Sequence, residues 1–528
     1  MTTRPLAGLV GRLEARDELR SVPGSRSDLS DVAVGGVTHD SRLVRPGDVF
    51  VAVPGAHHDG HDHVPGAVDA GAAALVLERA VPTPGIPQLL VRAARPALAS
   101  TAAWFEGDPS HRLGVVGITG TDGKTTTSYL VRSMLEACGL AAGMLGTIDV
   151  VVAGASLGNP GRATTPEAPE LQGHLRAMAD GGDRFAVVEA TSHGLAQDRV
   201  AEVAWDVAVH TNVTHEHLEF HRTPEAYRAA KRRLFERLAS GPANPDKGYG
   251  KHAVVNRDDP WAGIFLDAAR EAGATITGYG AGPGGEADVR ATAVREGRRL
   301  EVTVRTRRWQ APVRLALAGR YNVHNALAAI GVGEALGLDP VAMRAGLEAL
   351  ERVPGRMEPV DLGQPFRVLV DYAHSPEALA KALDAIAPLA AAGGGGLIAV
   401  FGSAGDRDTA KRPMMGRVAG ERCRLVVVTD EDPRSEDRDA ILDAIAEGAE
   451  HAGRVRGHDL QLIADRATAI AAAIEQARPG DVVLLAGKGH ERTIETAEGP
   501  MAWDEAGAAR AALRSLGFDE RPTATAVS

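Results

Sequence analysis

The most constraining feature of this chain is the stretch at residues 113–127, which reads LGVVGITGTDGKTTT. An apolar run typical of a buried strand leads directly into glycines, a lysine and threonines, and residues 128–138 continue with helical spacing. A strand, a Gly-rich loop and a helix in this order bind phosphates, because backbone N–H groups and the helix N-terminus face them. The sequence therefore predicts a nucleotide triphosphate site in an α/β fold.

This phosphate-binding loop (P-loop) is a variant of the usual one. Where the common template has its first glycine, this chain has Ile118. Lys124 is placed to reach the terminal phosphates, and Thr125 is placed to ligate Mg²⁺. The alternative is a Gly-rich turn with a solvated lysine. The residues expected to bind ATP here are Gly120, Thr121, Asp122, Gly123, Lys124, Thr125 and Thr126.

The length and the alternation of patterns predict three domains. A chain of 528 residues is too long for one core, and we expect domains at residues 1–112, 113–350 and 351–528. Strand-like apolar runs alternate with helical segments in each of them. The sequence thus predicts an α/β protein with a small N-terminal domain, a central parallel-sheet P-loop domain and a C-terminal Rossmann-like doubly wound domain.

Charge, cysteines and hydropathy exclude several classes of protein. The net charge of −11 argues against bulk binding to nucleic acid. The two cysteines, Cys138 and Cys423, lie far apart and have no metal-binding spacing, which is typical of a reducing compartment. The N-terminal residues do not resemble an export signal, and no apolar run is long enough for a membrane span. We expect a cytoplasmic protein that is not inserted in a membrane and acts as a monomer.

Two motifs follow strand-like runs, at the edge where parallel sheets bind ligands. Glu189 ends the run FAVVE and is suited to hold Mg²⁺ beside a triphosphate. Residues 211–221 read TNVTHEHLEFH, and three histidines at this spacing also suggest zinc. Because no cysteine lies nearby, an oxygen-rich Mg²⁺ site with His217 as a nitrogen ligand fits better. A loop that is only capped or lined by histidines such as His215 is the alternative.

The chain resembles the Mur ligases through motifs that follow in order: GTDGKTT, EATSHGL, TNVTHEHLEFH, YRAAKRRLF, AGRYNVHN, VPGRME, VDYAHSPEAL, GDRDTAKRP, DEDPRSED and GKGHE. The resemblance is strongest to members that add the third residue of the peptidoglycan stem peptide. It implies an amide ligase that uses ATP, Mg²⁺ (two ions), UDP-N-acetylmuramoyl-L-alanyl-D-glutamate and a free amino acid. The substrate carboxylate would attack the γ-phosphate of ATP, and the amino group would then attack the resulting acyl phosphate.

The resemblance also implies site residues by their place in these motifs. The UDP part of the substrate would lie near Ser41, His57 and His58, and its peptide part near Thr164, Thr165, Thr191, Gln197 and Arg199. Metal ligands would be Thr125, Glu189, His217 and Lys231, with Lys231 carboxylated to a carbamate. Catalysis would use Lys124, Lys231, His217 and Arg356.

The remaining implied residues lie towards the C-terminus. The adenine side of ATP would meet Asn322 and Asn325, and its phosphates Asp371 and His374. The incoming amino acid would meet Arg412, Glu431, Asp432, Pro433, Arg434, Gly487 and Glu491.

Arg434 bears on which amino acid is added. A guanidinium pairs bidentately with a carboxylate, which suits a diamino acid with a second carboxyl group, such as diaminopimelate. Members that add diaminopimelate usually have Asp-Asn-Pro-Arg in this loop, whereas this chain has Glu431 and Asp432. A carboxylate at position 432 would repel a ligand carboxylate or attract an ammonium group. Lysine or another diamine therefore stays possible.

Other functions remain as alternatives at this stage. A ligase of the folylpolyglutamate or cyanophycin type is disfavoured by the UDP-like first domain and by the DPR loop. Glu216 and Glu219 stand where the family usually has aspartates, which motivates a nucleotide-binding paralogue without turnover. A plain hydrolase or GTPase is disfavoured because the loop is a variant and no guanine-specific motif is present.

Overall fold

The computed structural model describes residues 3–23, 27–55, 58–83, 85–159, 163–214, 218–239, 247–282, 287–297 and 299–519. His57, His217 and Glu216 therefore lie outside the described residues. The chain divides into two compact units, which are described separately. Unit 1 comprises residues 1–292, 304–311 and 324–347, and unit 2 comprises residues 293–303, 312–323 and 348–528.

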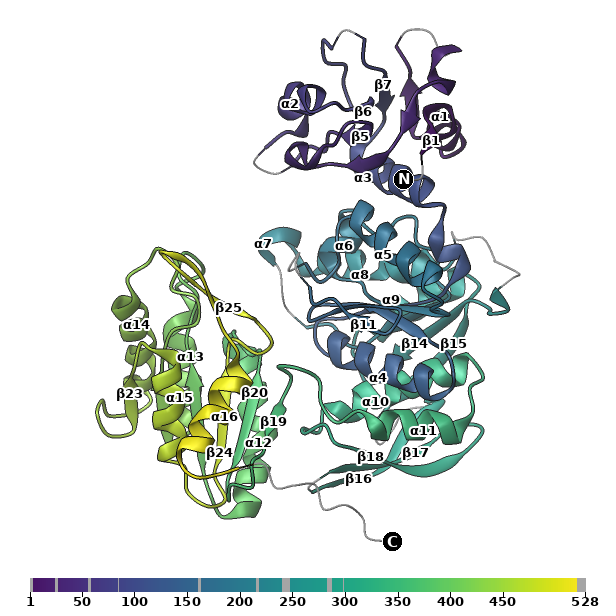
Figure 1. The fold of residues 1–528 in the computed structure, drawn as a ribbon. Coiled ribbons are helices and arrows are strands. Elements are labelled where there is room, and N and C mark those ends of the chain that lie inside the picture. The colour runs from purple at the N-terminus through teal and green to yellow at the C-terminus, as the bar shows by residue number, and fades with distance from the viewer. Residues whose placement is uncertain are drawn as a thin grey trace. The chain divides into compact units, whose positions relative to one another are not determined.

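Unit 1 begins with a five-stranded sheet (Figure 1). Its order is β2 (Leu19–Ser21), β7 (Gln88–Val91), β6 (Ala74–Leu77), β5 (Asp48–Val51) and β4 (Gly36–Thr38), with only the β2–β7 pair antiparallel. Helices α1 (Leu6–Ala15), α2 (Val64–Asp69) and α3 (Ala94–Glu106) accompany it, and β1 (Arg4–Pro5) pairs with β3 (Ala33–Val34). Strands β5 and β6 are buried along their whole length, as expected for parallel strands covered on both faces.

The second sheet carries the P-loop. Its order is β11 (Ala155–Ser156), β10 (Val150–Val152), β9 (Ala142–Leu145), β12 (Phe185–Glu189), β8 (Gly114–Thr119), β13 (Val207–His210), β14 (His252–Asn256), β15 (Thr275–Gly280), β16 (Val289–Glu296), β17 (Leu300–Arg305) and β18 (Gln310–Leu315). Strands β9, β12, β8, β13, β14 and β15 run parallel. In register, Val187 lies opposite Val116 on one side and Met144 on the other. The carboxyl ends of these strands therefore meet at one edge of the sheet.

Helices pack beside this sheet and position the site. They are α4 (Lys124–Ala137), α5 (Ala168–Asp180), α6 (Ser192–Ala196), α7 (Leu218–His221), α8 (Pro224–Glu236), α9 (Ala262–Glu271), α10 (Asn322–Ala335) and α11 (Pro340–Ala349). Helix α8 starts at Pro224. The preceding residue, Thr223, caps the helix because its side chain accepts a hydrogen bond from the N–H of Ala226. Its buried stripe contains Tyr227 and Lys231, so the helix carries a lysine on its core-facing side.

Unit 2 is a doubly wound sheet. Its order is β19 (Glu358–Val360), β20 (Arg367–Asp371), β24 (Val482–Ala486), β21 (Leu397–Phe401), β22 (Leu425–Val428) and β23 (Leu460–Leu462), parallel except for β19. One face packs on α12 (Pro376–Gly393), α13 (Lys411–Arg422) and α14 (Arg438–His451), the other on α15 (Arg466–Glu475) and α16 (Glu505–Ser515). Strands β25 (Thr493–Thr496) and β26 (Gly499–Ala502) form a hairpin.

These sheets confirm the predicted α/β class with parallel sheets and a doubly wound C-terminal part. Among the described residues, none of the helices combines the length and the hydropathy needed to cross a membrane.

Candidate functional site

The P-loop follows β8 and leads into α4. Two of its glycines are required by close contacts: a Cβ on Gly120 would lie 1.8 Å from Oγ1 of Thr211, and one on Gly123 would lie 2.4 Å from Oδ1 of Asn325. Gly123 also has a φ of +83°, which favours glycine. The Nζ of Lys124 donates to the carbonyl oxygens of Gly120 at 3.0 Å and Thr121 at 2.8 Å. The predicted strand, loop and helix are therefore present, with the lysine folded onto the loop.

Glu189 lies beside this loop in a cluster of threonine hydroxyls. Its side chain is fully buried, and its Oε2 accepts hydrogen bonds from Oγ1 of Thr125 and Oγ1 of Thr147, both at 3.0 Å. Oε1 accepts from the N–H of Thr147, also at 3.0 Å. Thr147 was not predicted, although it follows β9 at the same sheet edge and could have been found by the rule that identified Glu189. The structure thus brings two predicted metal ligands, Thr125 and Glu189, into contact.

The chemistry of this cluster fits Mg²⁺ better than zinc. Hydroxyl and carboxylate oxygens are the ligands that Mg²⁺ prefers. Within the described ranges, no group of three or more His, Cys, Asp or Glu side chains is placed to hold a metal ion. Lys231 would offer oxygen ligands only after carboxylation, and His217 lies outside the described residues.

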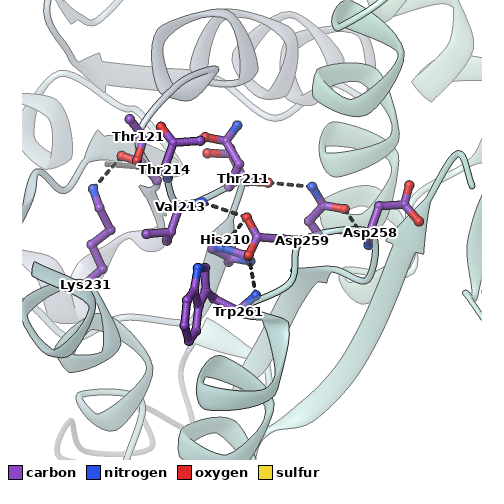
Figure 2. Close-up of polar contacts among 12 residues, drawn as sticks. Thr121, His210, Thr211, Val213, Thr214, Lys231, Asp258, Asp259 and Trp261 are labelled. Carbon is purple, nitrogen blue, oxygen red and sulfur yellow. Dashed lines mark hydrogen bonds and ion pairs between the residues drawn. The ribbon is translucent and has the colours of Figure 1, made fainter. Parts of the chain in front are cut away.

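Lys231 reaches the P-loop from α8. Its side chain is 1% exposed, and its Nζ donates to the carbonyl of Gly120 at 2.6 Å. The same Nζ lies 4.4 Å from the ring centroid of Tyr227, whose hydroxyl is 3.0 Å from Oγ1 of Thr121. Figure 2 shows Lys231 pointing towards the loop at Thr121. The structure therefore places the predicted modified lysine at the nucleotide loop, and adds Tyr227, which sequence reasoning missed.

His210 ends β13 close to this site without joining it by a hydrogen bond. It is fully buried, neither ring nitrogen has a hydrogen-bond partner, and the ring stacks on Phe265 at 4.0 Å. Burial, aided by the charge of Lys231, lowers the pKa of His210 to about 3. Asp259 faces it at 3.9 Å and accepts from the N–H groups of Val213 and Trp261 (Figure 2). The imidazole is therefore neutral at pH 7 and fills a core position.

The threonines predicted to bind the muramoyl peptide adjoin the Glu189 cluster. Oγ1 of Thr164 lies 3.0 Å from Oγ1 of Thr147. Oγ1 of Thr165 donates to the carbonyl of Glu189 at 2.7 Å and lies 3.0 Å from Oγ1 of Thr191. Thr191 in turn caps α6 by accepting from the N–H of Gly194. One hydroxyl-lined surface thus connects the Glu189 cluster to the predicted peptide site.

Gln197 and Arg199 extend this surface. Arg199 donates to the carbonyl of Thr165 at 2.8 Å and to Oε1 of Gln197 at 2.6 Å. It also pairs with Glu167 at 3.0 Å, and Arg95 of α3 pairs with the same carboxylate at 2.6 Å. Two guanidinium groups share one carboxylate, so the cluster keeps an excess positive charge suited to an anionic substrate.

Ser41 and His58 lie in the five-stranded domain. Ser41 opens a short turn at Ser41–Leu43, which Asp40 caps by accepting from the N–H of Arg42. Bonds from Arg42 lower the pKa of Asp40 to about 2. His58 closes a turn in which its carbonyl accepts from the N–H of Gly55. No hydrogen bond between described residues joins Ser41 or His58 to the threonine surface.

The two asparagines predicted for adenine fall in different units. Asn325, in unit 1, lies against Gly123 and 3.4 Å from Oγ1 of Thr127, so it adjoins the P-loop. Asn322, in unit 2, donates to the carbonyl of Ala318 at 2.6 Å.

In unit 2, the residues predicted for the phosphates surround Tyr372. Asp371 accepts from the N–H groups of Met357 and Ala373, each at 2.9 Å. Burial raises the pKa of Asp371, and the charge of Arg356 opposes that rise. The guanidinium of Arg356 lies 5.1 Å from the ring centroid of Tyr372, and Nδ1 of His374 is 2.8 Å from the Tyr372 carbonyl. The structure brings these three predicted residues together.

The predicted amino-acid pocket contains an internal charge balance. Lys488 is fully buried, and its Nζ donates to Asp432 at 2.8 Å and to Glu491 at 2.5 Å. The N–H of Glu495 also donates to Asp432 at 2.8 Å. Oε2 of Glu431 has no hydrogen-bond partner among the described residues. A Cβ added at Gly487 would lie 3.1 Å from this oxygen. Lys488 thus neutralises the carboxylate that distinguishes this loop.

Arg412 has an internal partner. Its guanidinium is buried and pairs with both oxygens of Glu436, at 2.6 and 2.8 Å. These bonds lower the pKa of Glu436 to about 2. Arg407, on the preceding loop, is exposed and forms no ion pair with a described residue. Arg412 therefore has its charge paired within unit 2, whereas the guanidinium of Arg407 is exposed.

Arg434 lines a cavity of about 850 Å³ in unit 2. Among the arginines of its wall, Arg438 pairs with Asp430 and Arg466 with Glu505, whereas Arg434 has no carboxylate partner among the described residues. Its buried Nε also lacks a hydrogen bond. The cavity therefore presents one uncommitted guanidinium.

Comparison with known sequences gives a consistent result. Three family models match the chain: "Mur ligase family, catalytic domain" at residues 33–103, "Mur ligase middle domain" at 118–333, and "Mur ligase, glutamate ligase domain" at 355–489. A UDP-N-acetylmuramyl-tripeptide synthetase of Roseiflexus sp. is 51% identical, covering 92% of this chain and 95% of the relative. A UDP-N-acetylmuramoyl-L-alanyl-D-glutamate–2,6-diaminopimelate ligase of Geobacter metallireducens is 41% identical, covering 87% and 90%.

Solved structures share the same architecture. A UDP-N-acetylmuramoyl-L-alanyl-D-glutamate–2,6-diaminopimelate ligase matches with a TM-score of 0.66 and 29% identity, over 94% of this chain and 97% of that one. MurF from Acinetobacter baumannii matches in fold, with a TM-score of 0.63 and 21% identity over 92% and 96%.

Proposed function

The chain belongs to the Mur ligase family, and we propose that it joins diaminopimelate to UDP-N-acetylmuramoyl-L-alanyl-D-glutamate in peptidoglycan synthesis. Members of this family form amide bonds at the expense of ATP. In this proposal residues 1–112 bind the UDP part, residues 113–350 bind ATP, and residues 351–528 bind the amino acid. The protein acts in the cytoplasm as a monomer.

Unit 1 activates the substrate carboxylate. Lys124 exchanges its two loop carbonyls for the terminal phosphates and offsets the charge that develops during phosphoryl transfer. Thr125, Glu189, carboxylated Lys231 and His217 would hold Mg²⁺. The metal supplies further charge neutralisation at the phosphates. Arg356, which lies in unit 2, is the remaining residue proposed for catalysis. The carboxylate attacks the γ-phosphate, ADP leaves, and the amine then displaces phosphate from the acyl carbon.

The observation that supports diaminopimelate over other amino acids is the guanidinium of Arg434, unpaired among the described residues. It is the cavity guanidinium without a carboxylate partner, and the second carboxylate of diaminopimelate would complete it bidentately. Asp432 does not oppose this, because Lys488 already holds its Oδ1. The second ammonium group of diaminopimelate suits Glu431, whose Oε2 has no hydrogen bond. Charge complementarity to the carboxylate and the ammonium group at the unreacted end of the ligand thus supports the proposal.

A second candidate, the addition of lysine or ornithine, rests on one observation. Asp432 and Glu491 share the single charge of Lys488, which leaves one excess negative charge to attract an ammonium group. Such a ligand would leave Arg434 unpaired.

The test is phosphate release from ATP with Mg²⁺ and UDP-N-acetylmuramoyl-L-alanyl-D-glutamate, with diaminopimelate stereoisomers, lysine and ornithine compared in parallel. We expect turnover with diaminopimelate, and Arg434→Gln should raise its KM roughly 30-fold by removing a charge-assisted pair. Arg456→Gln, five residues after the end of α14 and paired with Asp443 and Glu450, is the control and should leave KM unchanged.

Other outcomes identify other functions. Turnover only with lysine or ornithine would assign the ligand ammonium to the acidic side of the pocket. If no amino acid supports phosphate release although the protein binds MgADP, the protein uses a different carboxylate substrate or is a paralogue without turnover.

A further inference from the structure

Two of the groups that contact the amine of Lys231, the carbonyl of Gly120 and the ring of Tyr227, favour a positive charge. The carbonyl oxygen of Gly120 accepts its hydrogen bond at 2.6 Å. The ring of Tyr227, with its centroid 4.4 Å from Nζ, presents a face of negative partial charge. Both side chains are 1% exposed, so water screens these interactions little.

Tyr227 also holds the P-loop. Its hydroxyl lies 3.0 Å from Oγ1 of Thr121, which additionally accepts from the N–H of Thr214 at 3.0 Å. Tyr227 and Lys231 are one helical turn apart on the buried stripe of α8, so the helix fixes their spacing. Figure 2 shows Thr121 and Thr214 side by side, with Lys231 directed at the same loop. One tyrosine therefore touches both the nucleotide loop and the lysine.

Carboxylation changes this arrangement. The ammonium of Lys231 loses a proton to solvent, Nζ forms a bond to the carbon of CO₂, and a second proton leaves, so that a carbamate with one negative charge remains. The carbamate keeps a single N–H donor, and its oxygens carry negative charge. Both the Gly120 carbonyl and the ring face of Tyr227 repel that charge.

We propose that Tyr227 is a positioning residue that couples the P-loop to the carboxylation of Lys231, its hydroxyl fixing Thr121 and its ring retaining the uncarboxylated amine. This inference rests on the proposed function, in which Lys231 is carboxylated. Because coupling between two binding events is reciprocal, a nucleotide that draws the loop away from Lys231 favours CO₂ capture, and CO₂ strengthens nucleotide binding equally.

Two variants separate the contact of Tyr227 with Thr121 from its contact with Lys231. Tyr227→Phe keeps the ring and removes the hydroxyl. It should weaken MgADP binding about fivefold in calorimetry, the loss expected for one hydrogen bond, and leave carboxylation unchanged. Tyr227→Leu removes both contacts. Its carbamate signal, followed by ¹³C NMR during titration with labelled bicarbonate, should reach half-maximum at about threefold lower CO₂ than in the unaltered protein.

Tyr279→Phe is the matched control. Tyr279 is also fully buried, and its hydroxyl donates to the carbonyl of His210 at 3.0 Å and lies 3.5 Å from that of Thr211. The variant therefore loses a buried hydrogen bond whose acceptors are neither Thr121 nor Lys231. It should leave both MgADP binding and the CO₂ titration unchanged.

Each arm has an overturning result. If Tyr227→Phe binds MgADP like the unaltered protein, the hydroxyl does not position the loop. An unchanged CO₂ titration in Tyr227→Leu means that the ring does not retain the amine. Where the leucine variant does not fold, equal MgADP affinity of the unaltered protein with and without bicarbonate overturns the coupling. If the unaltered protein shows no carbamate signal at saturating bicarbonate, Lys231 is not carboxylated, and both that part of the proposed function and the role of the Tyr227 ring are wrong. The MgADP affinity of Tyr227→Phe still tests whether the Tyr227 hydroxyl positions the loop.

Discussion

The candidate nucleotide site of unit 1 and the candidate amino-acid pocket of unit 2 both hold buried or half-buried carboxylates, but they stabilise them differently. Glu189 in unit 1 accepts hydrogen bonds from two threonine hydroxyls and a backbone N–H. In unit 2, Asp432 is held by Lys488 and Glu436 by Arg412. A carboxylate held by neutral donors keeps its negative charge available to a cation. The charge of a carboxylate that is paired with a lysine or arginine is already neutralised. The first arrangement suits metal binding, and the second suits a pocket whose net charge selects a ligand.

The largest effect should come from Glu189→Gln. The substitution keeps the shape of the side chain and removes the charge that the hydroxyl cluster leaves available. We expect kcat for phosphate release to fall about 1000-fold, because charge stabilisation at the phosphates is lost. Thr147→Val, which removes one donor to the same carboxylate, should have a much smaller effect. A kcat within tenfold for Glu189→Gln would mean that Glu189 does not hold the metal.

A stability measurement tests whether unit 2 depends on ion pairs. Arg466 and Glu505 form a bidentate pair in which both side chains are 1% exposed. Glu505→Gln leaves the guanidinium buried without its counter-charge and should lower the free energy of unfolding by about 3 kcal/mol in urea titrations. Glu421→Gln, which alters an exposed pair with Arg417 on α13, should change it by less than about 0.5 kcal/mol. Equal effects would remove the distinction between the two pairs.

The smallest effect concerns acid stability in unit 1. His210 has a pKa of about 3 in the folded protein, below its ordinary value of 6.5, so the unfolded chain takes up its proton first as pH falls. The folded state therefore loses stability from about pH 6.5 down to pH 3 through this residue, by about 1 kcal/mol at pH 5.5. His210→Phe, which keeps an aromatic ring on Phe265, should be less sensitive to acid over this range. Parallel stability curves for the two proteins between pH 5 and 7 would contradict this assignment.

Much of the unit 1 site follows from the sequence, because it is made at the ends of neighbouring parallel strands. The P-loop and Glu189 directly follow or end apolar runs, and parallel strands bring such positions to one edge. Thr147 also follows a strand at this edge, so the position of a residue after a strand was enough to predict it. Tyr227 could not be predicted from the sequence, because a tyrosine on the buried stripe of a helix has the pattern of a core residue.

The pocket of unit 2 was less predictable. Asp432 in the loop suggested a carboxylate that could repel a ligand, but Lys488, 56 residues away, neutralises it. Arg412 was expected to meet the amino acid, and its guanidinium pairs with Glu436, 24 residues away, which the sequence did not show. The sequence shows which charges are present, but it does not show which of them are paired.

By itself, the sequence determined the class of fold, the P-loop and the order of the motifs, because periodicity and glycine spacing are local properties of the chain. Only the tertiary structure decided that Lys231 lies against Gly120 and Tyr227, and that Arg434 is the cavity arginine left without a carboxylate partner among the described residues. The physical reason is that electrostatic pairing depends on distance and burial in space, and strands and helices from distant parts of the chain set both.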